Sequence, residues 1–326
     1  MKKVLIAILL LGLLPHASAD YIHWVDFRLS APVLRSALEL DMASQGGEQP
    51  LDWIDILALA AAWRGGTGVT VADTQRAAQA LRGDTPPERL PGMAGRYFSY
   101  YREAYGAALG GLAGHFAIRR TDPQTGEAEW IPAYGLKAFS PIAAGYFWSH
   151  YPDFGAQRSY GYARPHLGND ILGALGTPIC AVEGGTVEAL GWNRYGGWRI
   201  GIRSDDRKRY YYYAHLRKDT PYAEGLAVGQ RVQAGDVIGF MGRTGYSTQE
   251  NVNNIETVHL HFGLQLIFDE SQKECDSEIW IDVYPLIELL ASHCSSVARD
   301  PQTGRWERLY PYCDLDAEPL RSAAAR

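Results

Sequence analysis

The chain has 326 residues, of which 46% are hydrophobic and 21% are charged, and its formal net charge is −6. This composition excludes a largely disordered chain, and the length allows about two globular domains. A mildly acidic chain without a basic patch binds nucleic acid poorly, so no nucleic-acid partner is expected.

Residues 1–19 are predicted to form a secretory signal peptide. Two lysines precede an apolar run over residues 4–14, and residues 17–19 read Ala-Ser-Ala, which is a signal-peptidase pattern. We therefore expect cleavage after Ala19 and export to the periplasm, the cell wall or the medium. The apolar run is shorter than the roughly 20 residues of a membrane helix, and no later run is longer, so no stable membrane span is expected.

Residues 20–135 are predicted to form a mostly helical N-terminal domain of unknown role. Ser30 is expected to cap a first helix, and Asp52 a second helix that ends at Gly65. A third helix is expected to follow Asp73.

A longer helix is expected over residues 97–108. Its tyrosines Tyr97, Tyr101 and Tyr105 are spaced four apart and therefore share one face. This stripe is interpreted as core or domain contact, and the alternative is that it forms one wall of a substrate groove.

After Leu136 the pattern changes to short β-rich runs separated by glycine turns, which predicts an antiparallel sheet with a folded β-roll over residues 136–296. Residues 297–326 are predicted to be a C-terminal extension. The sequence Asp-Pro-Gln-Thr-Gly occurs at residues 122–126 and again at 300–304, and both copies are predicted turns between strands. The fold class is therefore α+β, with the helical domain before the sheet.

Four cysteines follow the predicted signal peptide, and three full pairings of them are possible. Cys294 with Cys313 is the favoured disulfide, because both lie toward the C-terminal extension. Cys180 lies in an apolar run and is predicted to be a buried small hydrophobe. The fourth is Cys275, and none of the four has zinc-finger spacing.

Three segments supply candidate metal ligands and proton-transfer groups: His166 with Asp170 four residues later, His215, and the pair His259 and His261. A catalytic zinc site uses three nitrogen or oxygen ligands and leaves a fourth position open. Alternation along a strand puts His259 and His261 on one face, with the residues between and after them in the core. The same rule puts the tyrosines at 211 and 213 on the face of His215.

These motifs resemble the lysostaphin-type (LytM-like) zinc metallopeptidases, which hydrolyse peptide bonds in bacterial peptidoglycan. The resemblance runs from about residue 161 to 286. It includes His166-x-x-x-Asp170, Gly176-Thr177-Pro178, Tyr213-x-His215-Leu216 and His259-Leu260-His261-Phe262.

The resemblance implies that His166, Asp170 and His261 bind one Zn²⁺ per chain. It also implies that His215 and His259 flank the water and assist catalysis, and which of the two is the base stays open. The expected protein is thus an exported metalloprotease, a hydrolase acting on peptidoglycan stem or cross-link peptides.

Two features depart from the family pattern. Gly263 stands where the family commonly has glutamate. The segment 247–257 is longer than the family loop, and it is either a groove-lining loop or a surface loop. The remaining histidines of the mature chain are interpreted as structural: His23, His115, His150 and His293.

Two alternatives stay open. One is a non-catalytic cell-wall binding or amidase-activating module of the same fold, although such relatives lose ligand or histidine positions and this chain keeps all five. The other assigns the working role to residues 20–116, as a regulatory domain that masks the groove. The peptidoglycan bond that is cleaved is not predicted.

Overall fold

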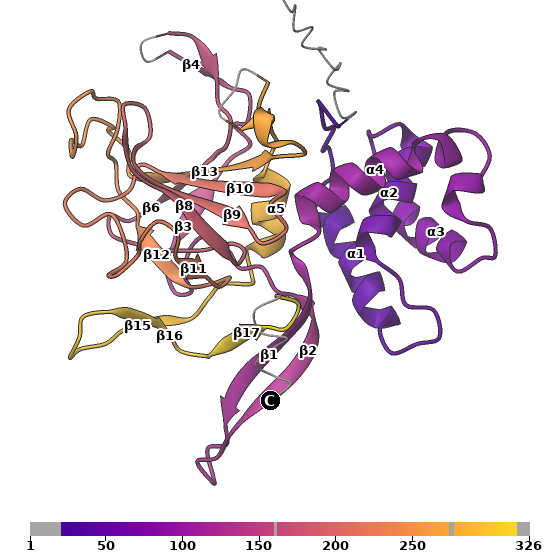
Figure 1. Ribbon diagram of the computed structural model, residues 1–326, viewed down its shortest axis with the longest axis horizontal. Helices are drawn as coiled ribbons and strands as arrows, with labels where there is room; N and C mark the ends of the chain where they lie inside the picture. Colours follow the sequence, from indigo (N-terminus) through magenta and orange to yellow (C-terminus); the bar gives the residue numbers. More distant parts are fainter. Residues whose placement is uncertain (1–20, 160–161, 274–276, 318–326) are drawn as a thin grey trace, which may run out of the picture.

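The computed structural model describes residues 21–159, 162–273 and 277–317. The predicted signal peptide (1–19) and Cys275 lie outside the described residues. A group of helices lies beside a β-rich body, and a long hairpin projects from the junction between them (Figure 1). Among the described residues, no helix is both long and apolar enough to cross a bilayer.

The first two helices begin where the sequence predicts. α1 (Ala31–Ser44) has Ser30 at its N-cap, but the Ser30 side chain makes no capping hydrogen bond, so that part of the prediction is wrong. α2 (Trp53–Arg64) is capped by Asp52, whose carboxylate accepts a hydrogen bond from the backbone N–H of Ile54 at 2.7 Å. It ends at Gly65 with φ of 64°, a left-handed conformation that glycine adopts without strain.

The third helix begins earlier than predicted. α3 (Val71–Leu81) starts before Asp73, because Thr70 is the N-cap residue and Asp73 is the third residue of a capping box. The Thr70 hydroxyl accepts from the Asp73 N–H, and the Asp73 carboxylate accepts from the Thr70 N–H. An acidic residue at this position stabilises the first turn from within the helix.

The tyrosine stripe lies on α4 (Met93–Leu109) and belongs to the core. Tyr101 and Tyr105 are buried, Tyr97 is half-buried against the same cluster, and the rings of Tyr101 and Tyr105 are 5.5 Å apart. The prediction of a packing role is confirmed, and none of the three lines the groove described below.

Both Asp-Pro-Gln-Thr-Gly segments are hairpin turns, as predicted. The first joins β1 (Ala113–Thr121) to β2 (Ala128–Leu136), and the second joins β15 (Val297–Arg299) to β16 (Trp306–Arg308). In each turn the aspartate carboxylate accepts from the backbone N–H two residues later at 2.7 Å. β17 (Tyr312–Asp314) pairs with β1, so the C-terminal segment adds a third strand to the first hairpin.

An antiparallel sheet forms the centre of the β-rich body, in the order β11-β8-β9-β10-β13-β6-β3 with β14 paired to β13. β12 and β7 form a separate pair. A short hairpin, β4–β5, lies near the groove. The bounds are β3 (Trp148–His150), β4 (Gln157–Arg158), β5 (Arg164–Pro165), β6 (Asn169–Gly173), β7 (Pro178–Cys180), β8 (Gly185–Asn193), β9 (Gly197–Ser204), β10 (Arg209–Ala214), β11 (Arg231–Val232), β12 (Val237–Phe240), β13 (His259–Leu266) and β14 (Ile279–Trp280).

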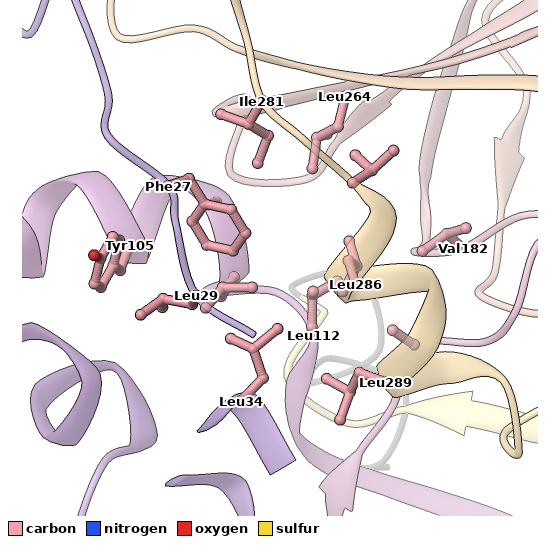
Figure 2. Close-up of a cluster of buried hydrophobic side chains, with 14 of the residues drawn as sticks. Phe27, Leu29, Leu34, Tyr105, Leu112, Val182, Leu264, Ile281, Leu286 and Leu289 are labelled. Atoms are coloured by element: carbon pink, nitrogen blue, oxygen red, sulfur yellow. The ribbon is translucent and has the colours of Figure 1, made fainter. Parts of the chain in front are cut away.

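The helical region and the sheet share one hydrophobic core. Figure 2 shows Phe27 and Leu34 from the N-terminal part facing Leu264 of β13 and Leu286 of α5 (Tyr284–Leu290), with Leu112 between them. All five side chains are buried. Burial of apolar area on this scale is the main stabilising term of a fold, so each part stabilises the other.

A buried cation also connects the two regions. Arg209 of β10 is 1% exposed, and its guanidinium donates to both carboxylate oxygens of Glu183 at 2.7 and 3.1 Å. A third donor of the same group reaches the carbonyl of Ala107, near the C-terminal end of α4, at 2.7 Å. Arg209 therefore satisfies helix carbonyls that have no partner within the helix.

The favoured disulfide between Cys294 and Cys313 is wrong, since both thiols are free. Cys313 lies on β17 opposite Ala117 of β1, whereas the Cys294 thiol follows α5 and donates to the carbonyl of Ala291. Cys180 is fully buried, as predicted for a small hydrophobe.

We expect Arg209→Met to lower the free energy of unfolding by about 3–5 kcal/mol, because it leaves Glu183 charged and buried without its partner. Urea unfolding followed by tryptophan fluorescence measures the change. The matched control is Arg231→Met, which removes an exposed pair with Asp205 and should cost less than about 1 kcal/mol. Equal effects of the two substitutions would contradict a special role for Arg209.

Candidate metal centre

Strand pairing brings the three predicted ligands together. Asp170 of β6 lies directly opposite His261 of β13, and Asp170 Oδ1 is 3.1 Å from His261 Nδ1. His166 Nε2 is 2.8 Å from His261 Nδ1 and 3.0 Å from Asp170 Oδ1. Donor atoms about 2 Å from a tetrahedral zinc ion lie roughly 3.3 Å apart, so one His-Asp-His group of this size fits such an ion.

The predicted alternation along β13 is confirmed. Leu260 and Phe262 are fully buried in the core, while His259 and His261 lie on the opposite face. The Asp170 carboxylate is 3.8 Å from His259 Nε2, so His259 lies beside the group without being one of its three members.

The predicted face of β10 is wrong. Tyr211 and Tyr213 are fully buried in the core, and it is Tyr210 and Tyr212 that line the groove with His215. His215 follows the end of the strand with φ of 61°, a left-handed conformation that breaks the two-residue alternation. This turn of the backbone returns the imidazole to the groove face.

Both flanking histidines are held by a backbone carbonyl. His215 Nδ1 is 2.9 Å from the carbonyl of Thr244, and His259 Nδ1 is 2.9 Å from that of Thr257. Because a carbonyl only accepts, each Nδ1 carries the proton and each Nε2 is an acceptor in the neutral ring. The two rings are 4.7 Å apart. Burial, and the charges of His259 and His261, hold the pKa of His215 well below its ordinary value.

Residues that no motif revealed support the ligands from behind. His166 Nδ1 is 3.1 Å from the backbone carbonyl of Asp153 and 3.2 Å from its carboxylate. Arg158 of β4 donates to Asp153 at 3.0 Å and to the outer oxygen of Asp170 at 2.9 Å. Asp170 thus directs Oδ1 at the histidines and Oδ2 at a guanidinium. Burial alone would raise the pKa of Asp170. Hydrogen bonds from His166 and His261 outweigh burial and hold this pKa well below its usual range.

His150 extends this support away from the centre. Its Nδ1 is 2.6 Å from the amide oxygen of Asn169, and its Nε2 is 2.7 Å from Glu288 on α5. Asn169 in turn donates to Asp153 at 2.8 Å. His150 therefore has the structural surroundings that the sequence predicts, within a chain of hydrogen bonds that ends at His166.

The ligands open into a groove with aromatic and charged walls. Arg164 lies over the ring of Tyr195 at 4.5 Å from its centroid on one side. On the other side are Tyr212 and Trp280, whose rings are 6.1 Å apart. The lining is completed from several strands and turns by Arg158, Pro165, Leu167, Asn193, Gly196, Arg199, Tyr210, Tyr246, Gln265, Lys273 and Glu278.

Gly263, the departure from the family glutamate, is explained by Trp280. A Cβ atom at position 263 would lie 2.8 Å from the indole ring of Trp280 and 2.9 Å from the carbonyl of Leu167. No larger side chain fits unless the indole moves. The indole N–H donates to Glu278 at 2.7 Å, so the tryptophan occupies the space and holds the carboxylate of Glu278, the residue before β14, at the groove wall.

The long segment 247–257 does not line the groove among its described residues. Asn251 accepts hydrogen bonds from the indole of Trp198 at 2.9 Å and from the N–H of Asp219 at 2.8 Å. Asn254 donates to the carbonyl of Tyr246 at 2.7 Å. These bonds favour the surface-loop interpretation, in which the segment supports Tyr246 from outside.

The antiparallel sheet brings His166, Asp170 and His261 into a group that could hold a metal ion. Residues 164–274 match the model of peptidase family M23, so this part of the chain is similar to that family. All five histidine and aspartate positions of the motif lie within the matched segment.

Three relatives are similar over this region. The L-Ala–D-Glu endopeptidase of Bacillus subtilis is 41% identical over 38% of this chain and 36% of its own length. The glycyl-glycine endopeptidase ALE-1 of Staphylococcus capitis is 39% identical over 30% of this chain and 24% of its own. The peptidoglycan DD-endopeptidase ShyC of Vibrio cholerae is 31% identical over 31% of this chain and 20% of its own. The match thus spans between 20% and 36% of the length of these relatives.

We expect Asp153→Asn to weaken metal binding about 10–100-fold, the usual scale for losing a group that orients a histidine ligand. Competition with a fluorescent zinc chelator measures the affinity. Asp73→Asn, which alters a buried aspartate of α3 far from the centre, is the control and should leave the affinity unchanged. An Asp153→Asn protein that is folded and binds zinc as tightly as the parent would contradict the positioning role.

Proposed function

We propose that the protein is an exported zinc metalloendopeptidase that hydrolyses peptide bonds of bacterial peptidoglycan. The observation that carries the proposal is the convergence of His166, Asp170 and His261 on one point. His215 lines the groove beside them, and the ring of His259 is 4.7 Å from that of His215. The similarity of residues 164–274 to peptidoglycan endopeptidases supports the substrate class. Export after Ala19 remains the expectation from the N-terminal sequence.

His166, Asp170 and His261 would hold the ion. Zinc bound there supplies Lewis acidity, which lowers the pKa of water toward about 7 and polarises a carbonyl. The chain supplies the proton handling. His215 and His259 each have Nδ1 engaged by a carbonyl, so a neutral Nε2 is available to take the proton of an attacking water and return it to the leaving amine. The other histidine would donate to the developing oxyanion in its protonated form, with the proton on Nε2 taken up from solvent water.

The bond that is cleaved is a separate question. The three relatives are named for three different peptide bonds, and their similarity to this chain covers the catalytic segment alone. The proposal therefore names only the class of bond, a peptide bond of the stem or of the cross-link.

Digestion of purified sacculi, with the released muropeptides identified by mass spectrometry, tests the proposal. The parent protein should bind one zinc per chain and release peptide-cleaved products. His215→Ala and His259→Ala should keep zinc and lose about 10²-fold or more in rate, whereas His261→Ala should lose both. Zinc loss in His259→Ala with retention in His261→Ala would reverse the two roles. Full activity in all three variants, or no cleavage by the parent, would replace the enzyme with a binding module.

The lowered pKa of His215 determines the pH at which activity is lost. A lowered pKa means that the neutral form persists to lower pH, so His215 stays a base where an ordinary histidine, with a pKa near about 6.5, is half protonated. We expect kcat/KM on a released muropeptide to be level between pH 7.5 and about 6.5 and to fall only below about pH 6. A pH–rate profile that is already half lost at pH 6.5 would contradict this environment for His215.

A further inference from the structure

The groove carries more cations than the metal centre uses. Beside the three predicted ligands and His215, its described lining includes four basic side chains and one carboxylate, Glu278. The whole chain has a net charge of −6, so the groove is basic against an acidic background. The four basic residues are Arg158, Arg164, Arg199 and Lys273.

Three of these four are already engaged. Arg158 is paired with Asp153 and Asp170, and Lys273 is paired with Glu188. Arg164 lies against the faces of Tyr195 and Tyr246, at 4.5 and 5.7 Å from the ring centroids. These cations hold the walls of the groove in place.

Arg199 differs from them. Its Nε is buried without a hydrogen-bond partner in the part of the chain that the structure describes, and no carboxylate there forms an ion pair with it. A buried donor that stays unsatisfied costs about 1–3 kcal/mol. Arg199 lines the groove without an ion-pair partner among the described residues, and a guanidinium is the group that best recognises a carboxylate, through paired N–H···O bonds.

The sheet gives the distance of Arg199 from the metal centre. Ile200 and Ile202 of β9 are buried in the core, so Arg199 alternates onto the groove face. Asp170 of β6 pairs with His261 of β13, which pairs with Ala214 of β10. Because Tyr213 of β10 pairs with Ile200 of β9, Arg199 of β9 lies beside Ala214. Two strand spacings separate Arg199 from His261, which is roughly 10 Å, or about three residues of an extended peptide.

We propose that Arg199 forms a subsite for a carboxylate of an acidic peptide, about three residues from the scissile bond. This inference rests on the proposed function and narrows its substrate class. Stem peptides carry free carboxylates, whereas a bridge made of glycine carries none along its length. The subsite therefore selects acidic stem peptides over neutral bridges.

The test compares two synthetic substrates: the stem tetrapeptide L-Ala–D-Glu–diaminopimelate–D-Ala and the same peptide with every carboxyl group amidated. The zinc-loaded parent, Arg199→Gln and Arg199→Lys are measured with each. We expect amidation to lower kcat/KM of the parent about 10–100-fold, mainly through KM, and that of Arg199→Gln by less than about threefold. Arg199→Lys keeps the charge and should retain part of the preference.

A matched control separates the subsite from overall charge. Arg231→Gln removes one positive charge from the same sheet outside the groove and should show the parent's full preference. If amidation affects the parent and Arg199→Gln equally, the carboxylate is bound elsewhere, for instance at the metal, and the inference is wrong.

Equilibrium binding makes this test independent of turnover. The same two peptides are titrated into the full chain carrying His259→Ala, with and without Arg199→Gln. A preference for the acidic peptide of about tenfold or more that disappears with Arg199→Gln supports the subsite even where no bond is cleaved. Absence of cleavage by the parent then counts against the proposed function alone, and absence of the binding preference counts against the subsite alone.

Discussion

The pairing of β6 with β13 is the constraint on which the site depends. It puts Asp170 opposite His261 and, through the same register, Leu260 opposite Ile171 in the core. Because side chains alternate, a slip of β13 by one residue against β6 would turn His261 into the core and Leu260 into the groove. The burial of Leu260 and Phe262 therefore stabilises the one register in which a metal can be held.

The local part of the centre was accessible from the sequence. His259 and His261 lie two residues apart in a strand, and period-two alternation is a property of the backbone that needs no knowledge of neighbours. Turn chemistry was equally local, since both Asp-Pro-Gln-Thr-Gly segments form hairpin turns. The change from helical to β-rich pattern near Leu136 was visible too, although the first hairpin begins earlier, at Ala113.

What the sequence did not reveal depends on single dihedral angles or on distant contacts. Alternation puts Tyr211 and Tyr213 on the face of His215, and this prediction is wrong because the positive φ of His215 ends the alternation of β10. Asp153 and Arg158 reach the ligands from irregular backbone and a two-residue strand, too short for any periodic signal. The disulfide prediction failed because the packing of β17 against β1, and not proximity along the chain, determines the place of Cys313.

Arg209 bears on how this catalytic segment is inherited. It lies within residues 164–274, the part shared with the relatives, whereas the Ala107 carbonyl that it binds lies outside that part. Recombination that moved the shared segment into another gene would carry along a buried cation and leave one of its acceptors behind. Because an unsatisfied buried donor is costly, the helical region and this segment are expected to be transferred together as a single unit of exchange.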